Sequence, residues 1–122
     1  MKLSKVIIFG AWREGISLFF EIYAKVEVVA FLDNNADIQS QNIYGIKILS
    51  LDNLNNVTYD EIYISSSKRY KEMYIQLIER GVRKDKIKII FGSDRVKRDL
   101  LVYSAFSKKE IEKFEIEWSK LR

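Results

Sequence analysis

The sequence predicts an α/β domain in three layers, with helices on both faces of an open, mostly parallel sheet of four to five strands, plus a C-terminal helix. Short runs of β-branched and aromatic residues are typical of strands that are buried on both faces of such a sheet. These runs alternate with segments whose apolar residues have helical spacing, which indicates parallel strands joined by helices. The length of 122 residues, 48% of them hydrophobic, suits one domain with its own core.

Residues 5–32 predict a strand, a helix and a second strand. The first strand is the apolar run over residues 5–9, which ends at Gly10. A helix is expected over residues 13–23 and a strand over residues 28–32. The apolar face of that helix comprises Ile16, Phe19, Phe20 and Tyr23. A unit of about 30 residues has the size of one right-handed strand–helix–strand crossover.

The middle of the chain predicts shorter elements before the next core strand. Residues 44–49 predict a short edge strand that follows a polar loop. Ser50 is a suitable N-cap for a brief helix that reaches residue 54. Residues 61–65 then predict a third core strand, because they are again rich in β-branched and aromatic residues.

The last elements of the core are a helix over residues 68–80 and a strand over residues 86–91. The helix has one apolar face, and Gly81 follows it where a C-terminal cap belongs. The alternation of strands and helices stops after the last strand. We therefore expect a Rossmann-like core over residues 1–92 and a helical extension over residues 93–122.

The extension predicts two helical segments. Residues 93–106 are expected to be helical, and residues 107–110 have the capping-box pattern that starts a second helix. The second helix has a narrow apolar stripe, which consists of Ile111, Phe114, Trp118 and Leu121. Two uses of the stripe stay open. It docks on its own domain, or it binds a second domain or another copy of the chain in a homo-oligomer.

The segment after the first strand matches two of the three glycines in the dinucleotide-binding pattern G-x-G-x-x-G. Gly10 takes the first position and permits the tight turn out of the strand. Gly15 takes the third position and lets the helix pack closely on the sheet. The amide groups at the start of the helix, around Ala11 and Arg13, are then expected to face a phosphate.

Trp12 stands at the second position of the pattern, where a glycine normally lets a pyrophosphate approach the backbone. Three interpretations stay open. The ring stacks on a base or sugar, it plugs the site, or it covers the sheet edge in a domain that no longer binds a dinucleotide. NAD(P) and a nucleotide-sugar are both kept as candidate cofactors, and Trp12 counts against NAD(P) because it obstructs the pyrophosphate of such a ligand.

Three further candidate binding residues lie at the ends of other strands. Asp33 lies 23 positions after Gly10, where an acidic residue binds a ribose hydroxyl in dinucleotide-binding domains. A turn role explains Asp33 equally well. Ser65 ends the third core strand and Ser66 follows it, and both are expected at the same sheet edge. Their hydroxyls either bond a ribose or phosphate, or only cap the next helix.

The composition excludes several classes of protein. The chain has no Cys and no His, so these residues cannot build a disulfide, a thiolate zinc site, a Ser-His-Asp triad or a Cys-His protease. The formal charge of +4 is uneven, since residues 1–61 have 5 Lys and Arg against 8 Asp and Glu while the remainder has 16 against 9. The mixture of signs in that remainder favours a solvated surface over nucleic-acid binding.

We expect a cytoplasmic protein with no membrane-spanning segment. No apolar stretch approaches the roughly 20 residues of a membrane span. The apolar run near the N-terminus is also too short for a signal peptide.

The order of these segments is similar to the Rossmann-like domain of bacterial surface-polysaccharide enzymes. Relatives with this domain are the nucleotide-sugar acetyltransferases, which have it at their N-terminus, and the nucleotide-sugar dehydratases, in which it binds the cofactor. The resemblance covers roughly residues 4–92, and the segments that carry it are residues 6–11, 29–34, 44–49, 59–65 and 77–82. It implies that Gly10, Gly15 and Asp33 hold a nucleotide or a nucleotide-sugar.

The resemblance implies a binding module of capsule or lipopolysaccharide biosynthesis, or of a sugar-transferase system. The acetyltransferases carry catalysis on a separate β-helix domain, and the dehydratases use a spaced Tyr–Lys pair. Tyr70 and Lys71 are adjacent here, so their side chains do not face each other on a helix. We therefore assign no catalytic residue and no metal ligand, and enzymatic activity stays open. The alternative function is a non-catalytic interaction or oligomerisation module with a degenerate NAD-type site.

Overall fold

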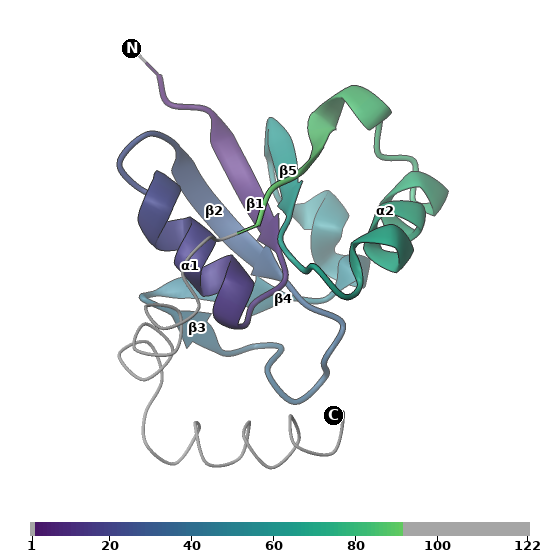
Figure 1. Ribbon diagram of the computed structural model, residues 1–122, viewed down its shortest axis with the longest axis horizontal. Helices are drawn as coiled ribbons and strands as arrows, with labels where there is room; N and C mark the ends of the chain where they lie inside the picture. Colours follow the sequence, from purple (N-terminus) through teal and green to yellow (C-terminus); the bar gives the residue numbers. More distant parts are fainter. Residues whose placement is uncertain (1, 92–122) are drawn as a thin grey trace.

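The computed structural model describes residues 2–91, and a six-stranded sheet forms the centre of this part of the chain (Figure 1). The strands lie in the order β3-β4-β2-β1-β5-β6, and every neighbouring pair is parallel except β3 with β4. Their bounds are β1 (Lys5–Phe9), β2 (Glu27–Leu32), β3 (Asn42–Ile43), β4 (Ile46–Leu49), β5 (Glu61–Ile64) and β6 (Ile87–Ile89). The predicted open, mostly parallel sheet is confirmed.

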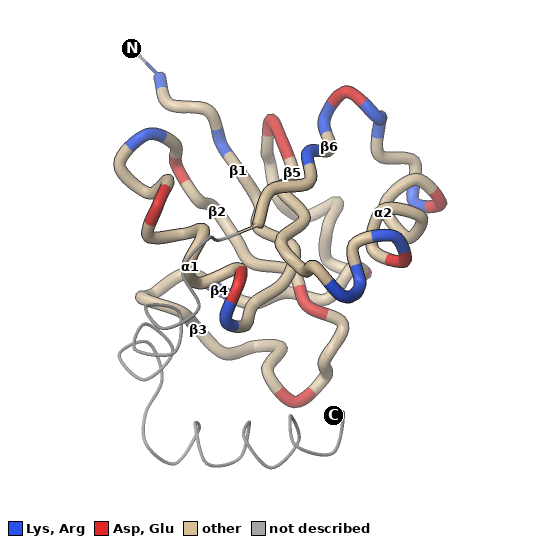
Figure 2. Tube along the Cα trace, in the orientation of Figure 1, with Lys and Arg blue, Asp and Glu red and all other residues tan. Residues whose placement is uncertain are grey.

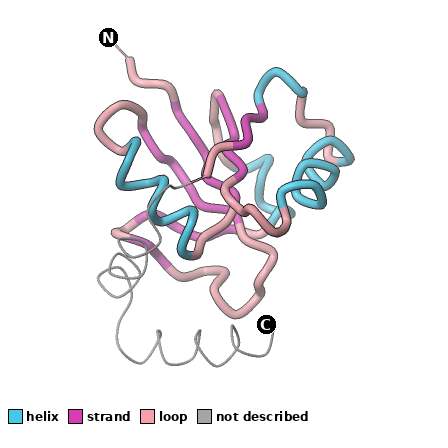
Figure 3. Tube along the Cα trace, in the orientation of Figure 1, coloured by secondary structure: helices cyan, strands magenta, loops and turns pink. Residues whose placement is uncertain are grey.

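Helices cover both faces of this sheet (Figure 3). One face carries α1 (Arg13–Ile22), and the other carries α2 (Tyr70–Glu79) together with the 3-10 helix η1 (Leu51–Asn56). A second 3-10 turn, η2 (Lys84–Lys86), connects α2 to β6. The predicted three-layer α/β architecture is confirmed. Among residues 2–91, no helix combines the length and the hydrophobicity needed to cross a bilayer.

The central strand β1 contributes to two separate hydrophobic clusters. Val6 and Ile8 pack in the cluster beneath α1, whereas Ile7 and Phe9 pack in the cluster beneath α2. All four side chains are 0% exposed. Burying a side chain of this size contributes about 1.5–3 kcal/mol to folding. A strand that is buried on both faces must be apolar at every position, which explains the uninterrupted apolar run.

A two-residue hairpin loop accounts for a strand that the sequence did not predict. Tyr44 and Gly45 both have positive φ angles, 50° and 82°, as in the turn type that suits the twist of paired strands. The chain reverses there, so that β3 pairs antiparallel with β4. The structure therefore differs from the edge strand expected over residues 44–49. The strand begins only at Ile46, and it lies between β3 and β2.

Aromatic side chains hold this hairpin loop against α1. The ring of Tyr44 stacks on Phe19 with their centroids 6.0 Å apart, and it meets Phe20 edge-on at 5.2 Å. Phe19 also stacks with Tyr23 at 5.8 Å and contacts Phe31 of β2 at 5.9 Å. Such pairs contribute about 0.5–1.5 kcal/mol each beyond the area they bury. The cluster therefore ties α1 to β2 and to the β3–β4 hairpin.

The ends of two helices differ in detail from expectation. Helix α2 begins at Tyr70, two residues later than predicted, because the chain first makes a turn over residues 67–69. Gly81, with a φ of 85°, follows α2 as predicted for a C-terminal cap. Ser50 precedes η1, but its side chain does not cap that helix in the described part of the chain. Its Oγ instead accepts a hydrogen bond from Asn53 Nδ2 at 3.3 Å.

The predicted helical extension lies outside the described residues. This applies to the helix over residues 93–106, to the capping box over residues 107–110 and to the boundary at residue 93. It also applies to the apolar stripe of Ile111, Phe114, Trp118 and Leu121. All of these stay predictions from the sequence.

Replacing a buried residue of α2 is expected to destabilise the domain far more than replacing an exposed one. Leu77 is 0% exposed, whereas Ile75 on the same helix is 55% exposed. We expect Leu77→Ala to lower the free energy of unfolding by about 2–5 kcal/mol, because it leaves a cavity beneath α2. The matched control Ile75→Ala should change it by about 0.5 kcal/mol or less. Urea unfolding followed by circular dichroism measures both, and equal losses would contradict the packing described here.

Candidate functional site

The connections between strands change direction at the centre of the sheet. From β1 the chain proceeds outward to β2 and on to the β3–β4 hairpin, and from β4 it crosses back to β5 on the other side of β1. In open α/β sheets, ligands bind outside the carboxyl ends of the strands at such a switch point. The segments after β1, β2 and β5 lie at this edge, and they contain all the candidate residues predicted from the sequence.

Gly10 forms the turn that leaves β1, and no other residue type fits there. Its φ is 118°, and a Cβ atom at this position would lie 2.7 Å from the carbonyl oxygen of Ser65. The amide of Gly10 also donates to the carbonyl oxygen of Leu32 at 2.8 Å. The predicted tight turn is thus present, and it brings the backbones that follow β1 and β5 into direct contact.

Gly15 allows the first turn of α1 to pack directly on the Gly10 turn. A Cβ atom at Gly15 would lie 1.5 Å from the carbonyl oxygen of Gly10, whereas Ile8 Cγ2 in the sheet is 3.4 Å away. The sequence predicts close packing of this glycine on the sheet. The closest contact is instead with the preceding turn, because the helix begins only a few residues after it.

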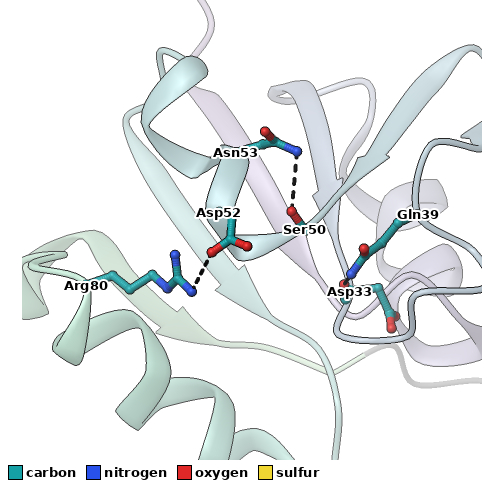
Figure 4. A network of polar contacts seen from close by, with 6 residues as sticks. All are labelled: Asp33, Gln39, Ser50, Asp52, Asn53 and Arg80. Carbon is teal, nitrogen blue, oxygen red and sulfur yellow. Dashed lines mark hydrogen bonds and ion pairs between the residues drawn. The ribbon is translucent and has the colours of Figure 1, made fainter.

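Asp33 links the end of β2 to the glycine turn. Its Oδ2 accepts a hydrogen bond from the amide of Ala11 at 2.8 Å, and its Oδ1 accepts one from the amide of Asn35 at 2.8 Å. The second bond is the turn role that the sequence suggested. Figure 4 shows that Gln39 reaches the main chain of Asp33, at 2.8 Å from its carbonyl oxygen, while the carboxyl group points away from Gln39.

Burial raises the pKa of the Asp33 carboxyl above its ordinary value. The hydrogen bonds from Ala11 and Asn35 oppose this rise, since they stabilise the charged form, and the positive charge of Arg69 opposes it more weakly. Desolvation is the largest of these effects. Asp33 is therefore a desolvated acceptor that is already oriented by two backbone amides.

Trp12 and Arg13 lie where the chain enters α1. Trp12 has an extended backbone as the residue before the helix, and its half-buried side chain packs against the cluster beneath α1. This contact fits a ring that covers the end of the sheet, while all three interpretations of Trp12 with respect to a ligand stay predictions from the sequence. Arg13 is the first residue of α1 and is also half-buried.

The serines after β5 differ in their surroundings. Ser66 Oγ accepts a hydrogen bond from the amide of Arg69 at 3.2 Å, so this serine helps to form the turn into α2. Ser65 is only 2% exposed, and none of the described residues provides a hydrogen-bond partner for its Oγ. A buried hydroxyl without a partner is rare in folded proteins and calls for an explanation.

Glu14 is a site residue that the sequence reasoning missed. Its carboxylate accepts two hydrogen bonds from Ser67, one from the amide at 2.9 Å and one from the hydroxyl at 2.5 Å. These bonds connect the start of α1 to the segment after β5 across the switch point. The available signal was an acidic residue in the first turn of a predicted helix, close to a glycine turn.

Basic residues lie beside these acidic groups. Figure 2 shows blue and red segments along the lower edge of the domain, at the start of α1, after β2 and in the turn that leads into α2. The turn into α2 contains Lys68 and Arg69, both exposed. Arg80 pairs with Asp52 at 2.9 Å and ties α2 to η1 (Figure 4). Within residues 2–91, no group of three acidic side chains could hold a metal ion.

Comparisons with known proteins support the fold. The family described as C2185-like, N-terminal, matches residues 2–88. The fold is similar to that of UDP-D-quinovosamine 4-dehydrogenase from Vibrio fischeri, with a TM-score of 0.57 and 18% identity over 73% of this chain and 76% of the dehydrogenase. It is also similar to RSP, a Rex-family repressor, with a TM-score of 0.55 and 13% identity over 98% of this chain and 64% of the repressor. No curated protein matches the sequence significantly. These similarities show a Rossmann-like fold.

The two glycines at the turn provide a test of its geometry. We expect Gly15→Ala to lower the free energy of unfolding by more than about 3 kcal/mol, because its Cβ would overlap the Gly10 carbonyl oxygen. The control Gly81→Ala also replaces a glycine, but no described atom lies within 4 Å of its Cβ position. That change should cost about 1–2 kcal/mol, for its positive φ alone. Thermal and urea unfolding compare the two, and a smaller loss for Gly15→Ala would refute the close contact.

The raised pKa of Asp33 predicts a pH dependence of stability. As the pH falls towards the ordinary carboxyl pKa, the folded protein takes up a proton on Asp33 before the unfolded chain does. The free energy of unfolding of the parent should therefore rise relative to Asp33→Asn, which lacks this titration. Urea unfolding of both proteins between about pH 7 and pH 4 measures this difference. A difference that stays constant or reverses over that range would show that burial does not dominate the titration of Asp33.

Proposed function

The chain belongs to the family described as C2185-like, N-terminal, and we propose that its Rossmann-like domain binds a nucleotide or nucleotide-sugar at the carboxyl edge of the sheet. The observation that carries the proposal is the position of Asp33 against the glycine turn. Its Oδ2 lies 2.8 Å from the amide of Ala11, at the end of β2. An acidic residue at this place binds the ribose hydroxyls in dinucleotide-binding domains of this fold.

Asp33 retains the capacity to hold a ribose. Each of its carboxylate oxygens accepts one backbone hydrogen bond, from Ala11 or from Asn35. A carboxylate offers about four acceptor positions, so further hydrogen bonds from a sugar are chemically available. Asp33 is already half-buried in the free domain, so a ribose that bonds it displaces less water than it would at an exposed carboxylate.

The charges at this edge suit a ligand that carries both a sugar and an anionic group. Arg13 opens α1, and Lys68 and Arg69 lie in the turn into α2. The amino end of α1 adds a positive partial charge from the helix dipole. Arg69 is close enough to Asp33 for its charge to act on that carboxyl, so a phosphate next to a sugar bound at Asp33 would meet a positive charge.

We further propose that the domain takes part in bacterial saccharide biosynthesis or in a sugar-transferase system. The similarity in fold to a UDP-sugar dehydrogenase supports UDP-sugars as the first ligands to test. The proposal assigns binding to residues 2–91 and no catalytic step. The chemical transformation would be carried out by other residues or by a partner enzyme.

Ligand binding is tested by thermal shift with UDP, UDP-N-acetylglucosamine and NAD on the 122-residue chain. A ligand at 100 times its Kd stabilises the folded state by about 2.7 kcal/mol, which raises the Tm by several degrees. Asp33→Ala should abolish the shift, whereas Asp52→Ala should preserve it, because the Asp52 carboxylate pairs with Arg80 and not with the Gly10 turn. No shift with any nucleotide, and no change in tryptophan fluorescence, would exclude nucleotide binding.

A further inference from the structure

We infer that Glu14 is a specificity-determining residue that occupies the place of a ligand phosphate at the amino end of α1. A phosphorylated ligand then has to displace Glu14 from Ser67, whereas the nucleoside part of a ligand does not. The inference rests on the proposed nucleotide site, because it states which part of a nucleotide that site accepts most readily.

Glu14 lies at the amino end of α1. It is the second residue of α1, where a negative charge is favoured by the helix dipole. Its carboxylate accepts hydrogen bonds from both the amide and the hydroxyl of Ser67, at 2.9 Å and 2.5 Å. Two donors that converge on one charged group are the arrangement by which proteins bind phosphate. Here the protein supplies its own anion.

The hydrogen bonds between Glu14 and Ser67, called the Glu14–Ser67 bridge, lie at the carboxyl edge of the sheet. Glu14 follows β1 and Ser67 follows β5, so their hydrogen bonds span the switch point at the carboxyl edge. This crevice is where ligands of open α/β sheets bind. A pyrophosphate that bound at the amino end of α1 would lie close to the Glu14 carboxylate. Both groups are negatively charged, so they would repel each other.

The buried hydroxyl of Ser65 is an independent observation at this edge. Ser65 directly follows Ile64, the last residue of β5, and its carbonyl oxygen lies against the Gly10 turn. The residue is 2% exposed, and its Oγ has no hydrogen-bond partner among the described residues. Its hydroxyl is therefore an unused donor next to the Gly10 turn. A phosphate oxygen that replaced Glu14 would give this hydroxyl a partner.

Asp33 completes the assignment of roles. It lies on the β2 side of the Gly10 turn, and its hydrogen bonds to Ala11 and Asn35 do not involve Glu14 or Ser67. A ribose can therefore meet Asp33 while the Glu14–Ser67 bridge stays closed. The unmodified protein should bind a nucleoside diphosphate less tightly than Glu14→Gln does, because a phosphate that reaches the amino end of α1 must first break the bridge.

The test is isothermal titration of uridine, UDP and inorganic pyrophosphate into the 122-residue chain and into Glu14→Gln. Glutamine keeps the size of the side chain and can still bond Ser67, but it removes the charge. We expect Glu14→Gln to raise the affinity for UDP and for pyrophosphate at least about tenfold, through the loss of like-charge repulsion. The affinity for uridine should change less than about twofold, because uridine has no charged group to interact with position 14.

Two further variants serve as controls for this test. Glu79→Gln removes the same charge from an exposed position at the far end of α2, and it should change none of the three affinities more than about twofold. Glu14→Ala removes the charge without introducing an amide, and it should reproduce the gain seen with glutamine. Circular dichroism confirms which variants are folded.

The outcomes separate this inference from the proposed function. If the parent binds UDP and neither Glu14 variant gains affinity for UDP or pyrophosphate, the role of Glu14 is wrong and the nucleotide site stands. If the parent binds neither uridine nor UDP but Glu14→Gln binds pyrophosphate, Glu14 fills an anion site and the nucleotide proposal fails. If no protein binds any of the three probes, both are wrong.

Discussion

The position of every candidate side chain depends on the close backbone packing around Gly10. A Cβ atom there would lie 2.7 Å from the Ser65 carbonyl oxygen, and one at Gly15 would lie 1.5 Å from the carbonyl oxygen of Gly10. Two glycines therefore bring the ends of β1 and β5 and the first turn of α1 into contact. A side chain at Gly10 would press on the Ser65 carbonyl, and a side chain at Gly15 would press the start of α1 away from the turn.

Two carboxylates accept hydrogen bonds from the backbone amides and the hydroxyl that this packing places at the sheet edge. Asp33 accepts from the amides of Ala11 and Asn35, and Glu14 accepts from Ser67. Loops and helix starts expose unpaired amides, and these attract any nearby anion. The domain thus holds its edge in place with its own acidic groups. The Rossmann-like fold that it shares with a dehydrogenase and a repressor does not by itself decide what this edge does.

The elements that the sequence predicted well are those whose signal is local. The central strand β1 is apolar at consecutive positions because both of its faces are buried, and Gly81 follows α2 because a positive φ favours glycine. The β3–β4 hairpin was missed because its loop places Tyr44, a residue type uncommon at positive φ, at the first turn position. Within the candidate site, the glycine turn and Asp33 were predictable from spacing, but their mutual hydrogen bonding was not.

By itself, the sequence determined the fold class, the tight turn at Gly10 and the presence of an acidic residue after β2. Those features follow from side-chain size, backbone freedom and hydrophobic periodicity, which act over a few neighbouring residues. Only the tertiary structure decided that Asp33 bonds Ala11 and that Glu14 bonds Ser67, 53 residues away. Such pairings depend on which strands become neighbours in the sheet, and that order is set by packing of the whole core rather than by any one segment.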